Sequence, residues 1–504
     1  MSEEVLINVG LGETRIAVVE DGVPTDLVLE RTSEEDLTAK TGRAGHSLLG
    51  NIFLGRVQRV LPGMQAAFVD IGLERAGFLG AREAKCLCEL MNLDEESLPP
   101  IAQCVHEGQA ILVQAVKDPI ADKGARLSAN VTLAGRQLVM VPNQSGVALS
   151  RRIENEDDRA RLTTMVEGII EKLGTHGVTG APAGYIVRTA ALEATESELI
   201  EDARRLAVQW EKVREVQKLT KPPAVVYHDL DPVAKTMRDY AGLETSRVVI
   251  DDLNAFNEAK AYCAATMPAM LERIHLHNGP GALFDMYDID GEIERALETR
   301  VELPSGGWII IENTEALTAV DVNSGRFTAS TGLEETSVKT NLEAAEMLVK
   351  QLRLRGTGGL IVIDFIHMNE PENNQKIVDA LNHGFERDRV PTQISGMSEF
   401  GLIEMTRKRV REPLEKLLTE VSNPGTPLRI KTRGTVANEL MRAVEKEACA
   451  GRPLVVRASP DVEHWFRARN AFLLERIRER LPVRVVLEAD PSLTRERFTI
   501  GYLK

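Results

Sequence analysis

Two aspartates, Asp321 and Asp364, have the residue type and the spacing that metal-dependent chemistry needs. Each lies near the end of a short apolar run, Leu317–Asn323 and Gly359–Phe365. Both runs are rich in β-branched residues and bounded by Gly or polar residues, which is typical of buried strands. If the two strand ends lie side by side, the carboxylates form a hard, anionic oxygen site. Mg²⁺ prefers such a site, with one or two carboxylates, several waters and a substrate phosphate as ligands.

The segment between the two runs must position them. Its apolar residues recur at the spacing of one helical face: Val338, Leu342, Ala345, Leu348 and Leu352. A strand, a helix and a strand in this order bring two strand ends together. Asn323 projects to the same side as Asp321 and can donate to a phosphate oxygen. A single Asp at a strand end is most often a turn or capping residue, whereas two of them joined by one helix favour the metal site.

Several longer motifs resemble the ribonuclease E/G family. Those around the two aspartates are Glu315–Gly325, Asn341–Glu346, Arg353–Arg355 and Gly358–Ile366. The others, in the family's order, are Asn51–Arg56, Ala66–Asp70, Gly77–Leu79, Lys123–Ala125, Ser150–Ile153 and Ile186–Thr189. The resemblance extends to about residue 412, and the rest of the chain matches only loosely.

This resemblance implies a multidomain α/β and α+β fold. The expected segments are a ribonuclease H-like domain in two parts (1–46 and 217–297), an inserted S1 RNA-binding barrel of the OB fold (47–128), a 5′-sensor domain (129–216), a DNase I-like catalytic domain (298–418), and a linker with a small C-terminal α+β domain (419–504). The patterns agree at two places. Alternation over residues 5–30 around Asp21–Gly22 predicts an antiparallel meander, and closely spaced short strands between 52 and 128 predict a small barrel.

The resemblance also implies two RNA-binding sites. In the barrel, Phe68 and Phe78 would stack unpaired bases and Lys123 would meet phosphate, although the local pattern alone predicts that both Phe side chains are core. Arg188 and Thr189, with the main chain at Val139, would bind a 5′-monophosphate. Arg can grip a phosphate with its bidentate fork, but a surface ion pair is the more common role of such an arginine.

Composition and charge limit the classes of protein and the cellular compartment that we expect. The net charge of −15 argues against nucleic acid by itself, because phosphate contacts need Lys and Arg; however, 406–411 and 467–480 are locally basic. No run of 18 apolar residues is present, so no membrane span is expected. The N-terminus lacks a basic region followed by an apolar core, which predicts no signal peptide. Five cysteines, few and odd in number, fit a reducing cytoplasm.

The cysteines do not predict a zinc site. Cys86 and Cys88, with Cys104 and His106, supply four potential ligands, but paired zinc ligands usually have two or more residues between them, so free packed thiols are favoured. Members of the family carry Cys-Pro-x-Cys just after the catalytic unit and share one zinc between two chains. Here 417–426 has neither cysteine nor histidine, and the next cysteine, Cys449, is single. We therefore expect no zinc, and a monomer or homodimer rather than a zinc-linked tetramer.

The implied function is that of a cytoplasmic, Mg²⁺-dependent endoribonuclease, with Mn²⁺ as a substitute. It would cleave single-stranded, AU-rich RNA, prefer 5′-monophosphate ends, and act in rRNA processing and mRNA decay. Asp321 and Asp364 would hold the metal, and Asn323 would orient the phosphate. Two departures from the family, His367 and Glu399, stand where acidic and basic residues are expected.

Two alternatives compete with this function. A non-catalytic RNA-binding or ribosome-assembly factor would keep the fold and lose the chemistry, but the carboxylate pair is intact. A phosphate-binding GTPase would need a Walker A loop, and the sequence has none.

Overall fold

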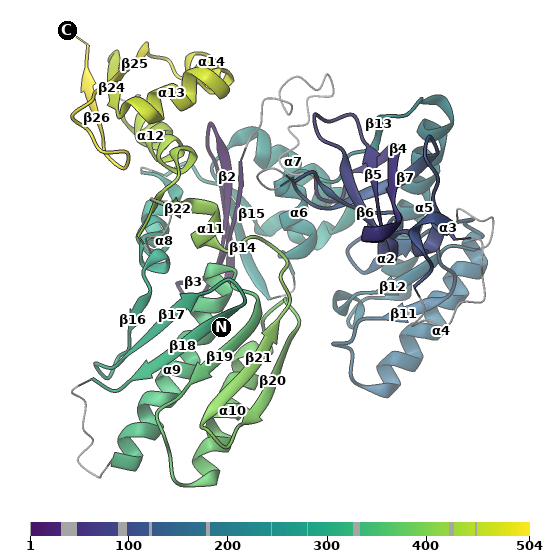
Figure 1. Ribbon diagram of the computed structural model, residues 1–504, viewed down its shortest axis with the longest axis horizontal. Coiled ribbons are helices and arrows are strands. Elements are labelled where there is room, and N and C mark those ends of the chain that lie inside the picture. Colours follow the sequence, from purple (N-terminus) through teal and green to yellow (C-terminus); the bar gives the residue numbers. More distant parts are fainter. Residues whose placement is uncertain are drawn as a thin grey trace. The chain divides into compact units, whose positions relative to one another are not determined.

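The computed structural model describes residues 2–31, 48–88, 98–119, 123–177, 182–242, 244–279, 281–325, 333–422, 428–448 and 451–503. The chain forms two compact units, coloured along the sequence in Figure 1. The first unit combines Met1–Glu34, Tyr240–Asn257 and Glu272–Lys504; the second combines Glu35–Asp239 and Glu258–Leu271. Both mix helices and strands, as the sequence predicts.

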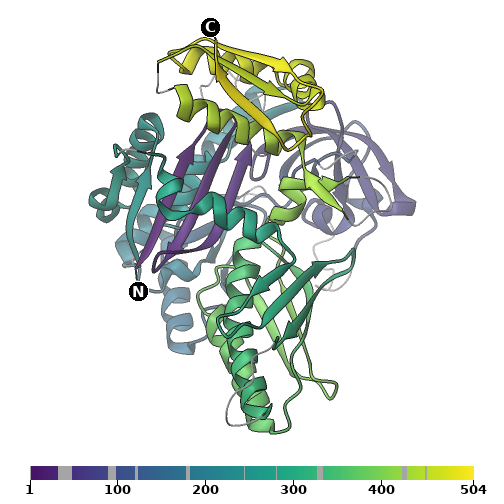
Figure 2. The same cartoon turned by 90° about the vertical axis from the view of Figure 1, so that its left-hand side faces the viewer.

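The first unit begins with a five-stranded sheet in the order β15-β14-β1-β2-β3. Its strands are β1 (Glu3–Val9), β2 (Glu13–Glu20), β3 (Val23–Arg31), β14 (Thr245–Ile250) and β15 (Ile274–Leu276). Asp21 and Gly22 have φ of 49° and 83°, which is the conformation of a two-residue hairpin turn, and the predicted meander is confirmed. Figure 2 shows α8 (Ile289–Leu297) lying across the β1–β3 strands, and η5 (Leu283–Tyr287) packs there too.

A six-stranded sheet in the order β16-β17-β18-β19-β21-β20 carries the two aspartates. Its strands are β16 (Arg300–Glu302), β17 (Trp308–Asn313), β18 (Leu317–Asn323), β19 (Gly359–Asp364), β20 (Thr392–Met397) and β21 (Leu402–Arg407). Helices α9 (Leu333–Arg355) and α10 (Pro371–Phe385) pack on one face, behind the sheet in Figure 1. Gly356, with φ of +65°, follows the last residue of α9, a position where glycine is common.

The last part of the first unit is a small α+β domain. A short hairpin, α11 (Leu414–Leu418), β22 (Thr419–Val421) and β23 (Arg429–Lys431), leads into it. Helices α12 (Arg433–Ala448), α13 (Pro460–Arg469) and α14 (Ala471–Arg480) pack with a sheet in the order β25-β24-β26, made of β24 (Leu454–Ala458), β25 (Val485–Ala489) and β26 (Phe498–Tyr502).

The second unit contains a closed barrel. Strands β4 (Ile52–Leu61), β5 (Ala66–Asp70), β6 (Gly77–Gly80), β8 (Arg126–Ser128) and β7 (Ala110–Lys117) pair in that order, and β7 pairs back onto β4. Short helical segments accompany it: η1 (Pro62–Met64), α2 (Ala81–Ala84), η2 (Lys85–Leu87) and α3 (Ile101–Cys104). This closure is consistent with the predicted OB-like barrel.

A four-stranded sheet in the order β11-β12-β10-β9 completes the second unit. Its strands are β9 (Leu133–Ala134), β10 (Leu138–Val141), β11 (Val147–Leu149) and β12 (Gly184–Val187). Helices α4 (Glu156–Leu173) and α5 (Glu196–Leu219) pack against it, and η3 (Thr189–Ala191) follows β12. We did not predict α4; its Asn155 side chain accepts from the backbone N–H groups of residues 157 and 158, a well-formed N-cap.

One boundary differs from the prediction. We expected 217–297 to complete the first domain, but β13 (Ala224–Tyr227) pairs antiparallel with β4 of the barrel, and the chain re-enters the first unit only at Tyr240. α6 (Pro232–Asp239) belongs to the second unit, and α7 (Leu253–Thr266) and η4 (Pro268–Arg273) each contain residues of both units. In the described part of the chain, no helix is both long and apolar enough to span a bilayer.

Candidate active site

The two aspartates lie side by side on neighbouring strands. β18 and β19 pair in parallel, and the register sets Asp321 directly opposite Asp364, where the strand spacing is about 4.8 Å. Val320 and Ile363, one residue earlier, are buried against α9 and α10. Because side chains alternate across a strand, both carboxylates project from the opposite, open face, where they are exposed.

No Lys, Arg or His in the described part of the chain forms an ion pair with these two carboxylates. Asn323 Nδ2 donates to Asp321 Oδ2 at 2.7 Å. Two adjacent anionic side chains with free oxygens and open solvent in front suit a hard divalent cation that keeps several waters. The residues present therefore fit Mg²⁺, with Asp321 and Asp364 as the two protein ligands.

Helix α9 fixes the loop that follows Asp364. The amide of Asn341, which is completely buried, bonds twice to the backbone of Ile366: Nδ2 donates to the carbonyl oxygen at 2.7 Å, and Oδ1 accepts from N–H at 3.0 Å. This side chain pairs with the backbone as a neighbouring strand would. Since Ile366 is two residues beyond Asp364, these bonds restrict where the carboxylate can sit.

Two turns earlier on the same helix, Glu334 holds the far end of this loop. Its carboxylate accepts from Asn369 N–H at 3.0 Å, Asn369 Nδ2 at 3.0 Å, Asn373 Nδ2 at 2.9 Å and Glu370 N–H at 3.3 Å. The bonds from Asn369 and Asn373 lower the pKa of Glu334 to about 2. Glu334 is therefore ionised at physiological pH, which is the form that accepts these hydrogen bonds.

The other side of the site is fixed by the same helix. Glu343 Oε2 accepts from Ser305 N–H at 2.9 Å, which anchors the turn between β16 and β17. A Cβ on Gly307 would lie 2.5 Å from the carbonyl oxygen of Asn323, so only glycine lets this turn pass so close to β18. Three side chains on α9 thus hold the segments that flank the carboxylates: Asn341 and Glu334 bind the loop after Asp364, and Glu343 binds the β16–β17 turn.

The two departures from the family also lie on this edge of the sheet. Asp364 pairs with Leu402 on β21, so the β20–β21 turn that carries Glu399 is next to the carboxylates. His367 lies in the loop held by Asn341, and both His367 and Glu399 are exposed. Neither forms an ion pair with a described residue.

Arg353 has a role that its sequence position did not reveal. A basic residue in the last turn of a helix commonly interacts with the helix dipole. Arg353 is instead 3% exposed and donates to Asp26 Oδ2 at 2.8 Å and to Glu20. α9 is thereby tied to β2 and β3 of the first sheet.

In the barrel, Phe68 and Phe78 face each other on paired strands. Their ring centroids are 6.2 Å apart at an interplanar angle of 75°, and both side chains are half-buried, whereas Ala67, Val69 and Leu79 beside them are fully buried. They are therefore on the outer side of the barrel, and the local pattern's expectation of two core residues is wrong. Lys123 is exposed near them, since Phe78 N–H donates to the carbonyl oxygen of residue 125.

Arg188 is held from two sides. Nη1 donates to the carbonyl oxygen of Gly135 at 2.6 Å and Nη2 to Asp239 Oδ1 at 2.7 Å. Burial alone would raise the pKa of Asp239, but hydrogen bonds and charge from Arg238 and Arg188 lower it overall. A guanidinium has five N–H donors, so three remain available to a ligand after these two bonds.

Thr189 and Val139 flank this arginine. The Thr189 hydroxyl lies 3.1 Å from Ser150 Oγ, and Val139 lies on β10 opposite Ile186. Arg188 N–H donates to the carbonyl oxygen of residue 137, which places the end of β12 beside the start of β10. The three residues that the resemblance selects are thus gathered at one end of this sheet.

The cysteines near the barrel are free thiols. Burial raises the pKa of both Cys86 and Cys104 to about 11, which favours the protonated thiol at neutral pH. In the part of the chain that the structure covers, no cluster of three or more His, Cys, Asp or Glu has the arrangement of a metal site. Cys449 lies outside the described residues.

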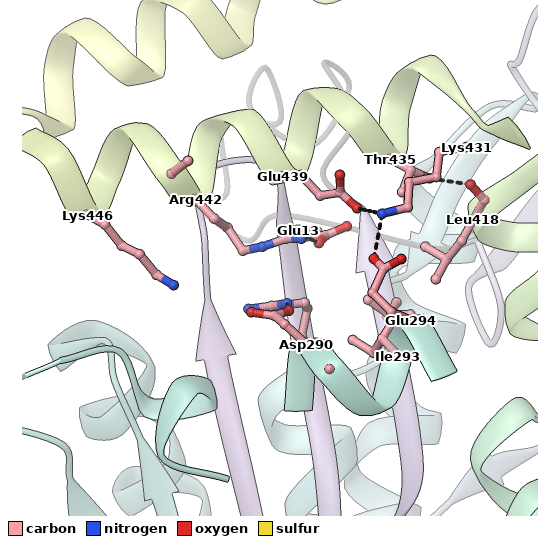
Figure 3. Close-up of a pocket in the computed structure, with 14 residues that line it drawn as sticks. Glu13, Asp290, Ile293, Glu294, Leu418, Lys431, Thr435, Glu439, Arg442 and Lys446 are labelled. Carbon is pink, nitrogen blue, oxygen red and sulfur yellow. Dashed lines mark hydrogen bonds and ion pairs between the residues drawn. The ribbon is translucent and has the colours of Figure 1, made fainter. Parts of the chain in front are cut away.

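A charged pocket of about 390 Å³ lies in the first unit between β2, β3, α8, α11 and α12 (Figure 3). Its cations are already paired, through Arg15–Asp290, Arg442–Glu13, Lys431–Glu294 and Lys446–Asp285. The close-up shows side chains of α12 meeting those of β2 and α8 across the pocket. Arg442–Glu13 joins α12 to the first sheet, Lys431–Glu294 and Lys446–Asp285 join β23 and α12 to α8 and η5, and the four pairs leave no surplus positive charge for a ligand.

Comparison with known proteins agrees with this geometry. The family model described as "Ribonuclease E/G family" matches residues 132–410. Ribonuclease G of Haemophilus influenzae is 38% identical over 504 residues, and that of Salmonella typhimurium 37% over 509, each covering 99% of both chains. Ribonuclease E of a Nostoc species is 37% identical over 391 residues, which is 76% of this chain and 55% of that protein. Similarity of this extent, over the carboxylate pair and the elements that position it, makes this chain a member of the ribonuclease E/G family.

Proposed function

We propose that this protein is an Mg²⁺-dependent endoribonuclease that cleaves single-stranded RNA and leaves a 5′-phosphate and a 3′-hydroxyl. The observation that carries the proposal is the uncompensated Asp321–Asp364 pair on an open sheet face. It occurs in a chain that matches proteins named ribonuclease G along almost its full length. Mn²⁺ is expected to substitute for Mg²⁺.

The chain's own residues have separable parts in this reaction. Asp321 and Asp364 supply the anionic oxygens that bind the cation, which when bound would polarise the scissile phosphate and acidify an attacking water. Asn323 holds Asp321 with one amide N–H, and its second N–H can donate to a phosphate oxygen. The open face of the sheet gives an RNA strand access to the carboxylates.

Substrate choice would rest on the second unit. Half-exposed Phe68 and Phe78, with Lys123 nearby, supply the stacking surface and the cation that single-stranded RNA needs. Arg188, oriented by Gly135 and Asp239, has three N–H donors left for a terminal phosphate. A preference for AU-rich RNA with 5′-monophosphate ends, and a role in rRNA processing and mRNA decay, belong to this proposal.

The test compares two variants that each remove one exposed carboxylate from the same sheet face. Asp364→Asn should abolish cleavage of a fluorescent, 5′-monophosphorylated oligoribonucleotide at saturating Mg²⁺. Glu404→Gln should leave it unchanged, because Glu404 is exposed on β21 and lies opposite Val362, not opposite either of the two aspartates. RNA binding, measured by anisotropy without Mg²⁺, should be nearly equal in both. Substantial turnover by Asp364→Asn, or none by the unmodified protein, would overturn the proposal.

A further inference from the structure

Phe400 is a large apolar side chain with no partner in the fold. It is 88% exposed, and within the described part of the chain it forms no ring or cation contact. Burying a Phe side chain stabilises a fold, and this chain forgoes that gain here. Single exposed apolar residues are common on proteins. Exposure alone therefore does not indicate a binding role for Phe400, and its location must be considered.

That location is beside the carboxylate pair. Asp321 lies opposite Asp364 on β19, and Asp364 lies opposite Leu402 on β21. Phe400 is two residues before Leu402, a reach on the order of 7 Å along an extended chain. The ring is therefore carried by the turn next to the candidate metal site, at the same edge of the same sheet.

The turn holds the ring in a defined place. Ser398 N–H donates to the carbonyl oxygen of Leu402 at 2.8 Å, Gly401 N–H to that of Ser398 at 3.0 Å, and Leu402 N–H to Ser398 Oγ at 3.1 Å. Gly401 has a φ of +80°, as expected for the last residue of a three-residue hairpin loop. Phe400 is the middle residue of this loop, so its backbone is fixed although its side chain is free.

The chemistry of the turn selects an uncharged ligand group. Glu399 adds a negative charge beside the ring and the turn has no Lys or Arg, which disfavours contact with phosphate. An exposed aromatic face suits a nucleobase, because every base presents a π-face. We infer that Phe400 is a base-stacking site for the RNA strand, which holds a nucleotide within one or two positions of the scissile phosphate.

This inference rests on the proposed endoribonuclease function. It predicts that loss of the Phe400 ring lowers kcat/KM, whereas loss of an exposed apolar side chain elsewhere on the sheet does not. Removing one base–aromatic stack costs a factor of about 5 to 150. Phe400→Ala should therefore lower kcat/KM for single-stranded RNA by that range, and Phe400→Trp should restore it. The control is Leu360→Ala, since Leu360 is 41% exposed on β19 at the end far from Asp364; this variant should behave as the unmodified protein does.

A series of oligoribonucleotides, each with one abasic position, tests contact directly. The unmodified protein should lose activity at one position near the cleaved bond, and Phe400→Ala should be insensitive to that same substitution. Fluorescence of 2-aminopurine at that position, measured without Mg²⁺, should be quenched by the unmodified protein and not by Phe400→Ala.

The possible results distinguish a failure of the stacking site from a failure of the proposed function. If the unmodified protein cleaves RNA and Phe400→Ala has the same kcat/KM as the unmodified protein on the intact oligoribonucleotide and on every abasic one, the stacking site is wrong while the proposed function stands. If the unmodified protein does not cleave, the proposed function has failed first. A change in mass by light scattering on Phe400→Ala, with unchanged 2-aminopurine quenching, would assign Phe400 to a protein interface and overturn the inference.

Discussion

Replacing Asn341 by Leu should loosen the loop after Asp364 without unfolding the sheet. The substitution removes both bonds to Ile366 and keeps a side chain of similar size in a completely buried site. An orphaned backbone group costs about 1–3 kcal/mol. Because Ile366 is only half-buried, we take the lower end of this range, about 1 kcal/mol, for its N–H and for its carbonyl group. The expected loss is about 2 kcal/mol, or roughly 30-fold more frequent local opening.

The matched control is Thr340→Val. Thr340 is the preceding residue of α9, equally buried, and its hydroxyl donates within the helix to the carbonyl oxygen of Thr336. This variant also changes a buried polar group to an apolar one of the same shape, but it breaks no bond to the loop. Any general loss of stability in α9 should therefore be similar in both variants.

Two measurements check the prediction. Hydrogen–deuterium exchange of a peptide covering residues 365–373 should rise strongly in Asn341→Leu and little in Thr340→Val. The Mg²⁺ midpoint of single-turnover cleavage should shift upward only in Asn341→Leu, with RNA affinity unchanged, because Asp364 is then less often in place. Equal exchange and equal Mg²⁺ midpoints in the two variants would refute the view that Asn341 positions Asp364.

Three further predictions concern other parts of the molecule. Arg188→Ala should erase the preference for 5′-monophosphate over 5′-hydroxyl RNA. A charge-assisted contact of about 1.5–3 kcal/mol would give a preference of about tenfold to a hundredfold. Equal slowing of both substrates would mark Arg188 as structural. Burial, reinforced by Asp251, raises the pKa of Glu445 to about 7, so urea unfolding should show stability falling by up to about 3 kcal/mol as pH rises from about 4.5 through 7, and Glu445→Gln should flatten this slope. Light scattering with metal analysis should find nothing larger than a dimer and no stoichiometric zinc, and a tetramer with about one zinc per two chains would contradict this.

The local sequence pattern was sufficient to predict those helices, strands and turns whose conformation depends mainly on their own residues. β18 and β19 follow from β-branched apolar runs, α9 from its apolar spacing, and the first hairpin from Asp21–Gly22. The adjacency of Asp321 and Asp364 also follows, because a helix between two strands makes them parallel neighbours. The sequence motifs around these elements also indicated the ribonuclease E/G family.

Pairings between distant segments could not be predicted in this way. β13 joins the barrel because its edge meets β4, some 170 residues earlier in the chain, and no local pattern specifies a partner at that separation. The same holds for Arg353, whose residue type suits a helix end anywhere but whose partners lie on β2 and β3. Exposure is equally a property of the fold: the pattern around Phe68 and Phe78 predicted core residues, and the barrel turns them outward.

The sequence by itself therefore determined which residues can do chemistry and which strands carry them. Tertiary structure decided how those residues are held. Asn341 and Glu334 are polar residues on a helix, and only the packing of α9 against the sheet brings them to the loop after Asp364. Phe400 likewise stands next to the carboxylates only because β21 pairs with β19. Hydrogen bonds and contacts of this kind depend on three-dimensional proximity, which spacing along the chain does not encode.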